Sequence, residues 1–432
     1  MLKIALVSEH ASPLAAAGSV DSGGQNIYVA QVATQLARAG CKVDVFTRLD
    51  SRELPDTIEW QRNVRVRHVR AGPAVSIPKE QLVPHMEEFG ERMLETLRAA
   101  RVPYDVIHAN FFMSAWAALR SARVLGIPLL TTFHALGRVR RAHQRDRDGF
   151  PDCRFEMEHE VVEGCDRIIA ECPQDRDDLV SLYGAEPDKI SVIPCGFDAD
   201  EMRPMDRMAA RRQLKWPDRF TVLQLGRLVP RKGIDNVIRA IAQLKARHAI
   251  QGELYVVGGG TRVPDPVATP EIARLSQLAI ALDIAEQVHF VGRRDRHQLQ
   301  LYYNAADVFV TTPWYEPFGI TPVEAMACAR PVVGSDVGGI RTTVDDGVTG
   351  YLVPPRDPAA LAARLNQLRR DPALARRMGE AGVERARKEF TWRGVGESLA
   401  QIYMRTARLV PAKATEDRVE VPLRAAAGAS FR

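Results

Sequence analysis

Long apolar runs, paired cysteines and a strong excess of one charge are all missing from this sequence of 432 residues. No run approaches the roughly 18 apolar residues that a helix needs to cross a membrane. The 59 basic side chains nearly balance the 54 acidic ones, and a net charge of +5 is too small to indicate nucleic-acid binding. We therefore expect a protein with no membrane span and no nucleic-acid partner.

The six cysteines are scattered, with no C-x-x-C pair and no histidine at zinc-finger spacing. Buried reduced thiols are the expected state, and they indicate a cytoplasmic protein. Residues 1–8 lack the basic segment and long apolar core of a signal peptide, so a first strand is expected there. The G-x-G-x-x-G fingerprint of dinucleotide-binding dehydrogenases is also missing near the N-terminus, which argues against that class.

Short apolar runs alternate with amphipathic stretches along most of the chain. This alternation predicts βαβ units and parallel sheets. The expected strands of the first half are 2–7, 42–47, 64–69, 105–109, 128–133, 167–171 and 190–193. Those of the second half are 219–225, 253–257, 287–291, 307–312, 331–335 and 350–353. The clearest expected helices are 24–39, 233–246, 270–282, 295–305, 319–329 and 358–386.

The alternation is interrupted at 194–198 (PCGFD), which is expected to be a crossover between two halves. We predict an α/β protein with two Rossmann-like domains, 1–197 and 198–390. A helix at 391–409 could pack on either domain. Residues 411–432 lose periodicity and are expected to form a loosely ordered tail.

The richest chemical pattern is 316–324 (EPFGITPVE), between an expected strand and an expected helix. Gly319 lies at the turn, where a ligand can approach the backbone closely. Free amides at the helix start favour an anion. Glu324 is placed to accept hydrogen bonds from ribose hydroxyls, and Glu316 to hold a sugar hydroxyl. Two solvated glutamates would give the same bare spacing, but the strand–loop–helix setting favours a site.

A second pattern, 226–233 (GRLVPRKG), also joins a strand to a helix. Fixed cations bind phosphate groups and lower the barrier of a reaction in which a leaving oxygen gains negative charge. Arg227 offers a planar fork and Lys232 a point charge, so the two are not interchangeable. On the pattern alone, a basic surface loop is the more frequent explanation.

Three weaker patterns lie in the first half. Gly23 and Gly24 precede a helix and can present amides to a phosphate, although such a pair is often only a turn. His134 follows an expected strand, at the sheet edge where α/β proteins bind ligands, while a lone histidine is more often structural. The run 138–147 holds five arginines, which suit a phosphorylated acceptor or simply an exposed loop.

Several of these segments together resemble one family. The segment 316–324 is similar to the E-x7-E motif of the retaining glycosyltransferases of family 4, which have the GT-B fold of two Rossmann-like domains facing a central cleft. Other similar segments follow in the family's order: 23–29, 133–138, 331–340 and 346–353. The resemblance covers residues 2–405 and is greatest to the branch of sucrose-phosphate synthases, sucrose synthases and the mycothiol glycosyltransferase.

The resemblance implies roles for individual residues. The donor- and nucleotide-binding residues would be Gly23, Gly24, Arg227, Lys232, Arg293, Glu316, Phe318, Gly319, Ile320 and Glu324. The catalytic residues would be His134, Arg227, Lys232 and Glu316. The acceptor-binding residues would be Gln25, Asn26, Arg138 and Arg141.

The resemblance further implies hexosyl transfer from UDP-glucose to a small acceptor such as fructose 6-phosphate, with the nucleotide sugar as co-substrate and no separate cofactor. At 110–114 the chain reads NFFMS, where the mycothiol branch usually has a His-Tyr-Trp-like run, and this argues against inositol phosphate as acceptor. A nucleotide-sugar epimerase of the same fold and a non-catalytic binding protein remain alternatives.

No metal is expected, and the oligomeric state is not predicted. Three D-x-D pairs occur, but none follows a strand as a nucleotide-sugar metal site requires. They are Asp146/Asp148, Asp175/Asp177 and Asp198/Asp200.

Overall fold

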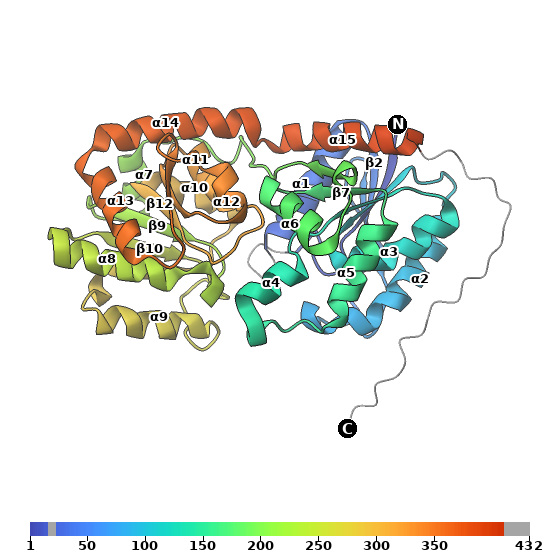
Figure 1. The fold of residues 1–432 in the computed structure, drawn as a ribbon, viewed down its shortest axis with the longest axis horizontal. Coiled ribbons are helices and arrows are strands. Elements are labelled where there is room, and N and C mark those ends of the chain that lie inside the picture. Colours follow the sequence, from blue (N-terminus) through green and yellow to red (C-terminus); the bar gives the residue numbers. More distant parts are fainter. Residues whose placement is uncertain (16–22, 410–432) are drawn as a thin grey trace, which may run out of the picture.

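The computed structural model describes residues 1–15 and 23–409. Figure 1 shows two α/β domains side by side, with helices α14 (Pro372–Glu389) and α15 (Trp392–Leu409) running along one edge of both. The predicted fold class, two Rossmann-like domains with parallel sheets, is confirmed. The predicted tail at 411–432 lies outside the described residues.

The first domain is built on a sheet whose described strands have the order β3-β4-β2-β1-β5-β6-β7-β8. Neighbouring strands are parallel except for β3 and β4, which pair antiparallel. The strands are β1 (Lys3–Val7), β2 (Lys42–Arg48), β3 (Thr57–Gln61), β4 (Val64–Val69), β5 (Val106–Asn110), β6 (Leu129–Thr132), β7 (Arg167–Ala170) and β8 (Ile190–Val192).

Both faces of this sheet are buried, as the strand β1 demonstrates. Its alternate residues enter different apolar clusters: Ile4 and Leu6 join one, and Ala5 and Val7 join the other. Because successive strand side chains point to opposite faces, a strand covered on both sides reads as a continuous apolar run. The helices that cover the sheet are α1 (Gly24–Arg38), α2 (Met86–Arg98), α3 (Phe112–Leu125), α4 (Gly137–Gln144), α5 (Cys153–Gly164) and α6 (Pro173–Tyr183).

The second domain repeats this plan around a parallel sheet of order β11-β10-β9-β12-β13-β14. Its strands are β9 (Thr221–Leu225), β10 (Glu253–Val257), β11 (Val288–Gly292), β12 (Val308–Thr311), β13 (Val332–Ser335) and β14 (Gly350–Val353). Its helices are α7 (Arg207–Leu214), α8 (Ile234–His248), α9 (Pro270–Ala281), α10 (Arg296–Ala305), α11 (Ile320–Ala327), α12 (Gly338–Thr343), α13 (Pro358–Arg370) and α14.

Each sheet has a point where the strand order reverses: between β1 and β5 in the first, and between β9 and β12 in the second. In open α/β sheets, ligands bind in the crevice at the carboxyl ends of the strands beside such a point. The fold therefore places the loops after β1, β5, β6, β9 and β12 where a ligand would sit.

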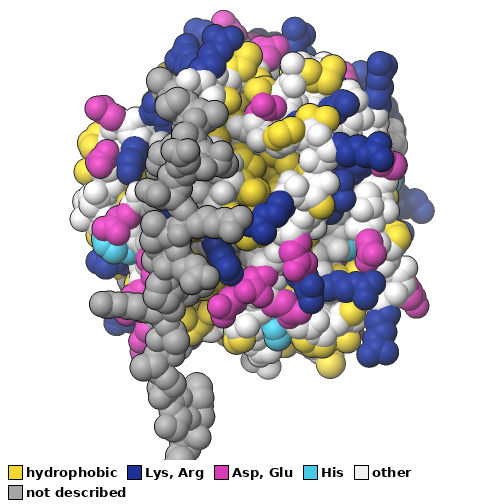
Figure 2. All heavy atoms as spheres, turned by 90° about the vertical axis from the view of Figure 1, so that its right-hand side faces the viewer, with side chains coloured by type: hydrophobic (Ala, Val, Ile, Leu, Met, Phe, Trp, Pro, Cys, Tyr) yellow, Lys and Arg dark blue, Asp and Glu magenta, His cyan; other side chains and the backbone are white. Residues whose placement is uncertain are grey.

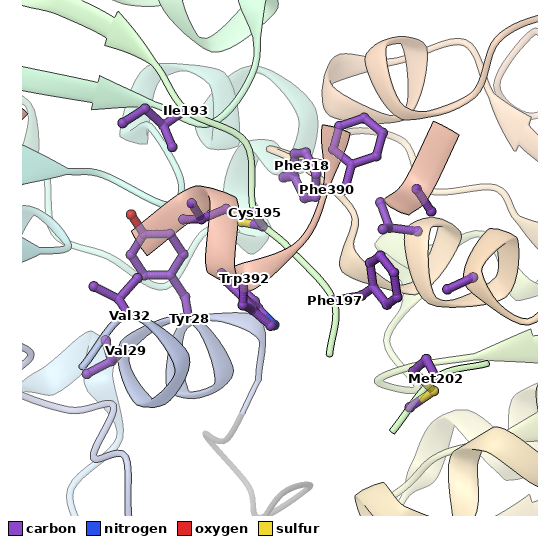
Figure 3. Packing of buried hydrophobic residues seen from close by; sticks show 14 of the residues in the cluster. Tyr28, Val29, Val32, Ile193, Cys195, Phe197, Met202, Phe318, Phe390 and Trp392 are labelled. Carbon is purple, nitrogen blue, oxygen red and sulfur yellow. The ribbon is translucent and has the colours of Figure 1, made fainter. Parts of the chain in front are cut away.

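Two chain segments cross between the domains, and they pair with each other. Phe197 N donates to Phe390 O at 2.8 Å, and Trp392 N donates to Phe197 O at 3.2 Å. The approach needs Gly196, because a Cβ there would lie 2.6 Å from Trp392 N. Apolar side chains surround the crossing (Figure 3), where Trp392 packs edge-on against Tyr28 of α1 with 5.9 Å between ring centroids.

Helix α15 returns to the first domain and contacts α1 and β5 there. Its buried Tyr403 hydroxyl lies 2.5 Å from Nδ1 of His108, a β5 residue whose pKa burial lowers to about 3. The helix that the sequence left free to pack on either domain therefore lies on the first.

The structure differs from the sequence prediction in two elements. Strand β3 was missed, because its side chains are half-buried or exposed and it pairs antiparallel at the sheet edge. The single helix expected at 358–386 is two helices, α13 and α14. They are divided at Asp371, whose side chain caps α14 by accepting from Leu374 N at 2.8 Å, and at Pro372, which lacks an amide hydrogen to continue α13.

The end of the first domain carries basic and acidic side chains intermingled with apolar ones (Figure 2). This mixture agrees with the near balance of 59 basic and 54 acidic residues in the sequence.

Candidate active site

Most residues predicted for the site lie at the carboxyl ends of strands beside the two switch points. The two domains approach each other closely there. A Cβ built on Gly23, just before α1, would lie 3.9 Å from Arg227 Nε, and one built on Gly24 would lie 3.7 Å from Ile320 Cδ1. The glycine loop of the first domain therefore faces both the basic loop and the start of α11 in the second.

The centre of the second-domain site is an ion pair between Lys232 and Glu316, with side chains 18% and 14% exposed. Lys232 ends a short 3₁₀ helix after β9, and Glu316 lies in the loop after β12. Arg231 Nη1 is 3.9 Å from the same glutamate oxygen. Burial lowers the pKa of Lys232. Burial alone would raise the pKa of Glu316, but the charges of Lys232 and Arg231 lower it overall.

Glycines let these two loops meet. Gly233 has a φ of +65°, and a Cβ there would lie 1.9 Å from Thr312 O, so a side chain is excluded. Position 338 also has no room for a side chain: Gly338 has a φ of +47°, and a Cβ built on it would lie 2.1 Å from Glu316 O. Gly339 N then donates to Glu316 O at 3.0 Å. The G-G pair after β13 thus holds the backbone of the glutamate loop in place.

Glu324 lies in the second turn of α11 and is only 2% exposed. Its Oε1 accepts from Arg296 Nη1 and its Oε2 from the Tyr303 hydroxyl, both at 2.8 Å. Arg296 also donates from Nε to Glu201, which lies between β8 and α7, in the segment that joins the two domains. The glutamate predicted to read a ribose is therefore firmly held in one orientation.

His134 follows β6 and has both ring nitrogens in hydrogen bonds. Nδ1 lies 3.0 Å from Glu171 Oε1, and Nε2 lies 3.0 Å from Asn110 Oδ1. Its φ of +58° is unusual for a residue other than glycine, and such strain is concentrated at functional sites. Glu171 also accepts from Cys195 Sγ at 3.0 Å. Burial acts to raise the pKa of Glu171, but His134 lowers it overall.

The predicted acceptor residues on α1 are already hydrogen-bonded within the domain. Asn26 accepts from Gly23 N at 2.9 Å and donates to Ser12 O at 3.0 Å, which fixes the start of the helix. Gln25 Nε2 lies 3.2 Å from Ser8 Oγ and 3.3 Å from Asn110 O. An acceptor role for either residue stays a prediction.

In the arginine run 138–147, some arginines pair with aspartates and at least one is exposed to solvent. Arg141 Nη1 lies 2.8 Å from Asp152 Oδ1, and its Nε lies 3.4 Å from Asp148 Oδ2. Asp148 also pairs with Arg140 at 2.6 Å. Arg138 is exposed, with its guanidinium 5.3 Å from the centre of the Tyr183 ring. Of the two predicted acceptor arginines, only Arg138 is not ion-paired in the described structure.

The domains also touch at the rim of the site, through the residue before Glu316. Tyr315 accepts from Gln144 Nε2 at 2.5 Å and stacks on His143 with 5.0 Å between centroids. A half-open cavity of about 560 Å³ adjoins this contact. It is lined from both domains, by Ala142, His143, Gln144, Arg145, Asp146, Arg147, Trp314, Pro355 and Arg356.

Three other predicted donor residues, Phe318, Gly319 and Arg293, have structural roles in this protein. The Phe318 ring is 2% exposed and packs 5.9 Å from Phe390, so its side chain belongs to the core (Figure 3). Gly319, with a φ of +93°, turns the chain into α11. Arg293 N donates to Thr261 O at 2.7 Å, which fixes the loop after β11.

Sequence reasoning missed five residues that support the site: Asn110, Glu171, Arg231, Arg296 and Tyr303. Two of them had a visible pattern, since Asn110 ends β5 and Glu171 follows β7, at the edge already expected to bind ligands. Arg231 is the sequence neighbour of Lys232. Arg296 and Tyr303 lie on a helix that carries no recognised motif, so only the fold brings them to Glu324.

All six cysteines are within the described residues and are free thiols. In residues 1–15 and 23–409 there is no group of three histidine, cysteine or acidic side chains arranged to hold a metal ion. Over the same residues, no helix is long and apolar enough to cross a membrane.

Comparison with known proteins agrees with this geometry. Residues 22–201 match the family described as Glycosyltransferase Family 4, and residues 206–385 match the one described as Glycosyl transferases group 1. The chain is 37% identical over 410 residues to D-inositol 3-phosphate glycosyltransferase 2 of Catenulispora acidiphila, which covers 94% of this chain and 95% of the relative. It is also 37% identical, over 425 residues, to the D-inositol 3-phosphate glycosyltransferase of Kineococcus radiotolerans, with 94% and 96% covered.

Among solved structures, sucrose-phosphate synthase from Thermosynechococcus elongatus is similar, with 35% identity and a TM-score of 0.86 over 95% of this chain and 100% of that one. Two facing Rossmann-like domains with a basic loop and an E-x7-E segment between them define a hexosyltransferase of the GT-B fold. This chain belongs to glycosyltransferase family 4, in the branch that contains these relatives.

Proposed function

We propose that this enzyme transfers glucose from UDP-glucose to a small sugar phosphate, with retention of configuration and without a metal ion. The observation that carries the proposal is the cationic cluster at the carboxyl edge of the second sheet. Lys232 and Arg231 lie beside Glu316, and Arg227 faces Gly23 across the cleft. In the described structure Lys232 and Arg231 both pair with the one carboxylate of Glu316, so these two cations carry more positive charge than that carboxylate neutralises, which suits a diphosphate.

The cluster suits the bond that must break. As the bond between the sugar and the diphosphate breaks, the leaving oxygen gains charge, and fixed cations in a partly buried site stabilise that charge. The start of α11 adds backbone amides that favour an anion. Together they supply the positive charge that a divalent metal would otherwise provide.

Retention follows if the acceptor attacks from the face that the diphosphate leaves. The acceptor oxygen forms the new bond to the sugar, the old bond to the diphosphate breaks, and the acceptor's proton passes to the departing diphosphate oxygen. The nearby carboxylates support this route over a protein nucleophile, because Glu316 is ion-paired and Glu171 is bonded to His134. His134 then contacts the donor sugar and does not act as a base.

For the acceptor we propose a phosphorylated small molecule. Fructose 6-phosphate is the first to test, because a sucrose-phosphate synthase is similar over the whole fold. Inositol phosphate is the second, because the relatives named above are called D-inositol 3-phosphate glycosyltransferases. The chain has phenylalanines at 111 and 112, where the mycothiol branch usually has a His-Tyr-Trp-like run. It therefore lacks a tyrosine hydroxyl there for an acceptor phosphate, which favours the first.

The test is a product assay by mass spectrometry, with UDP-, GDP- and ADP-glucose each offered with fructose 6-phosphate or inositol phosphate. Product should form from UDP-glucose, in the presence of EDTA, and NMR of the product should show the donor's anomeric configuration. Glu316→Gln should form little product, while the exposed control Glu397→Gln should match the wild type. Conversion of the nucleotide sugar without any acceptor would support an epimerase instead. Binding without turnover of any donor would support a non-catalytic protein.

A further inference from the structure

Helix α10 presents two donors to the buried glutamate of α11. Arg296 is the first residue of α10 and Tyr303 lies seven residues further on. Seven residues are close to two helical turns, so both side chains leave the same face of the helix. Each takes a different oxygen of Glu324 at 2.8 Å, and the plane of the carboxylate is fixed by bonds from both ends.

This arrangement is more rigid than burial of one glutamate requires. The Tyr303 ring is fully buried and packs 5.5 Å from Phe309. The start of α10 is fixed by Asp295, whose backbone amide bonds to Gln298 Oε1 at 3.2 Å. Arg296 is held from its other side by Glu201. Neither donor can follow the carboxylate if it rotates.

The two bonds leave capacity for a ligand. Each carboxylate oxygen can accept more than one hydrogen bond, so Glu324 retains lone pairs after Arg296 and Tyr303 have bonded. A carboxylate held in one plane can receive the two hydroxyls of a vicinal diol together. A carboxylate that is free to rotate would bind the diol more weakly, because ordering the carboxylate on binding costs conformational entropy.

We propose that Arg296 and Tyr303 are positioning residues that orient Glu324 so that the site selects a ribonucleotide over a 2′-deoxyribonucleotide. The inference rests on the proposed use of a nucleoside-diphosphate donor. It adds that the selection for the 2′-hydroxyl depends on two residues of α10 that do not themselves contact the ligand. Through Glu201, the same arginine joins the ribose site to the segment that crosses between the domains.

The test is the ratio of the dissociation constants of 2′-deoxy-UDP and UDP, measured by calorimetry on the full chain. In the wild type we expect UDP to bind about tenfold more tightly, the ratio expected from losing one hydrogen bond to a charged group. Tyr303→Phe removes only a hydroxyl and should lower the ratio to about threefold. Arg296→Met should bring it close to one, and Arg296→Lys should restore part of it.

Arg211→Met is the matched control, because Arg211 is a 2% exposed arginine of the same domain that also binds two carboxylates, Asp307 and Asp218. It should lose stability but keep the wild-type ratio. If Arg296→Met does not fold, Tyr303→Phe decides alone. The proposal is overturned if the wild type binds both nucleotides equally, or if Tyr303→Phe keeps the full ratio. If UDP, GDP and ADP all fail to bind the wild type, the proposed donor itself is wrong.

Discussion

The carboxyl edges of the two sheets differ in how their charged side chains are paired. In the first domain, the polar side chains satisfy one another: His134 bonds to Glu171 and Asn110, and Arg141 pairs with two aspartates. In the second, Lys232 and Arg231 share a single carboxylate. The groups named at the first edge are therefore satisfied by one another, whereas the two cations named at the second edge exceed the one carboxylate that they share, and we expect the diphosphate to bind there.

The pKa values show the same contrast. Burial, helped by the charge of Glu171, raises the pKa of Asp175 in the first domain to about 8. In the second domain the neighbouring cations outweigh burial and lower the pKa of Glu316. Replacing Lys232 should therefore weaken catalysis, and replacing Asp175 should stabilise the fold.

The largest effect is expected from removing a cation of the second edge. Lys232→Ala should lower the rate of nucleoside-diphosphate release by about 100- to 1000-fold, the usual cost of losing one fixed charge-stabilising donor. Lys232→Arg should recover only part of the rate, because a planar fork does not replace a point charge. The control is Lys245→Ala, which removes an exposed lysine paired with Asp283. Equal rates for the Lys232 and Lys245 variants would mean that the cluster does not stabilise the leaving group.

At the first edge, the effect of burying Asp175 can be measured as a change in the free energy of unfolding with pH. Its folded pKa, about 8, lies above the unfolded value of 3.8, so between these pH values the folded state holds a proton that the unfolded state has lost. The free energy of unfolding should fall as the pH rises from about 4 to 8. Asp175→Asn removes this loss and should stabilise the protein by on the order of 3 kcal/mol at pH 8.5 and by little at pH 4. Denaturant melts at both pH values measure it, and a pH-independent difference would contradict the assignment.

Glu171→Gln should have a smaller effect, on activity. The change keeps the shape beside His134 Nδ1 but removes the charge that orients the ring, and we expect kcat to fall about tenfold to 100-fold because the ring that contacts the donor sugar is misplaced. Glu160→Gln, on an exposed part of α5, serves as the control. A wild-type kcat in the Glu171 variant would show that the network around His134 is only structural.

The smallest effect is expected at the arginine run. Arg141→Ala should change the acceptor KM less than threefold, because Asp148 and Asp152 already neutralise the guanidinium. Arg138→Ala, which removes an exposed arginine, should raise it more. The reverse order would place the acceptor beside Arg141 and show that its ion pairs exchange when the acceptor binds.

The elements that the sequence predicted well are those with strong apolar patterns. Strands buried on both faces, such as β1, form unbroken apolar runs, and helices between them follow a helical period. Strand β3 has neither pattern. The Asp371-Pro372 pair in the sequence is typical of a helix start, and it marks the boundary between α13 and α14 that the prediction of one helix overlooked. The sheet partners of β3 and the docking of α15 depend on contacts distant in sequence, which a local pattern does not contain.

The site was predictable to the extent that its chemistry is local. Lys232 and Glu316 lie in motif loops, and the fold brings them together as an ion pair. The partners that orient the motif residues were not predictable, because Arg296 and Glu171 reach their sites through packing between elements. The pairing of the predicted acceptor residues was not predictable either, because Gln25, Asn26 and Arg141 bond to groups of other segments of the chain.

The paired crossing segments limit how the two domains can move. With Phe197 bonded to Phe390 and Trp392, bending of one segment carries the other with it, and rotation about a single axis is favoured over twisting. The same pairing provides redundancy against cleavage. A protease that cut the first crossing, near Gly196, would leave the second domain joined to α15, and α15 packs on α1 of the first domain. The nicked chain would then run as two fragments on a denaturing gel and as one particle in native solution.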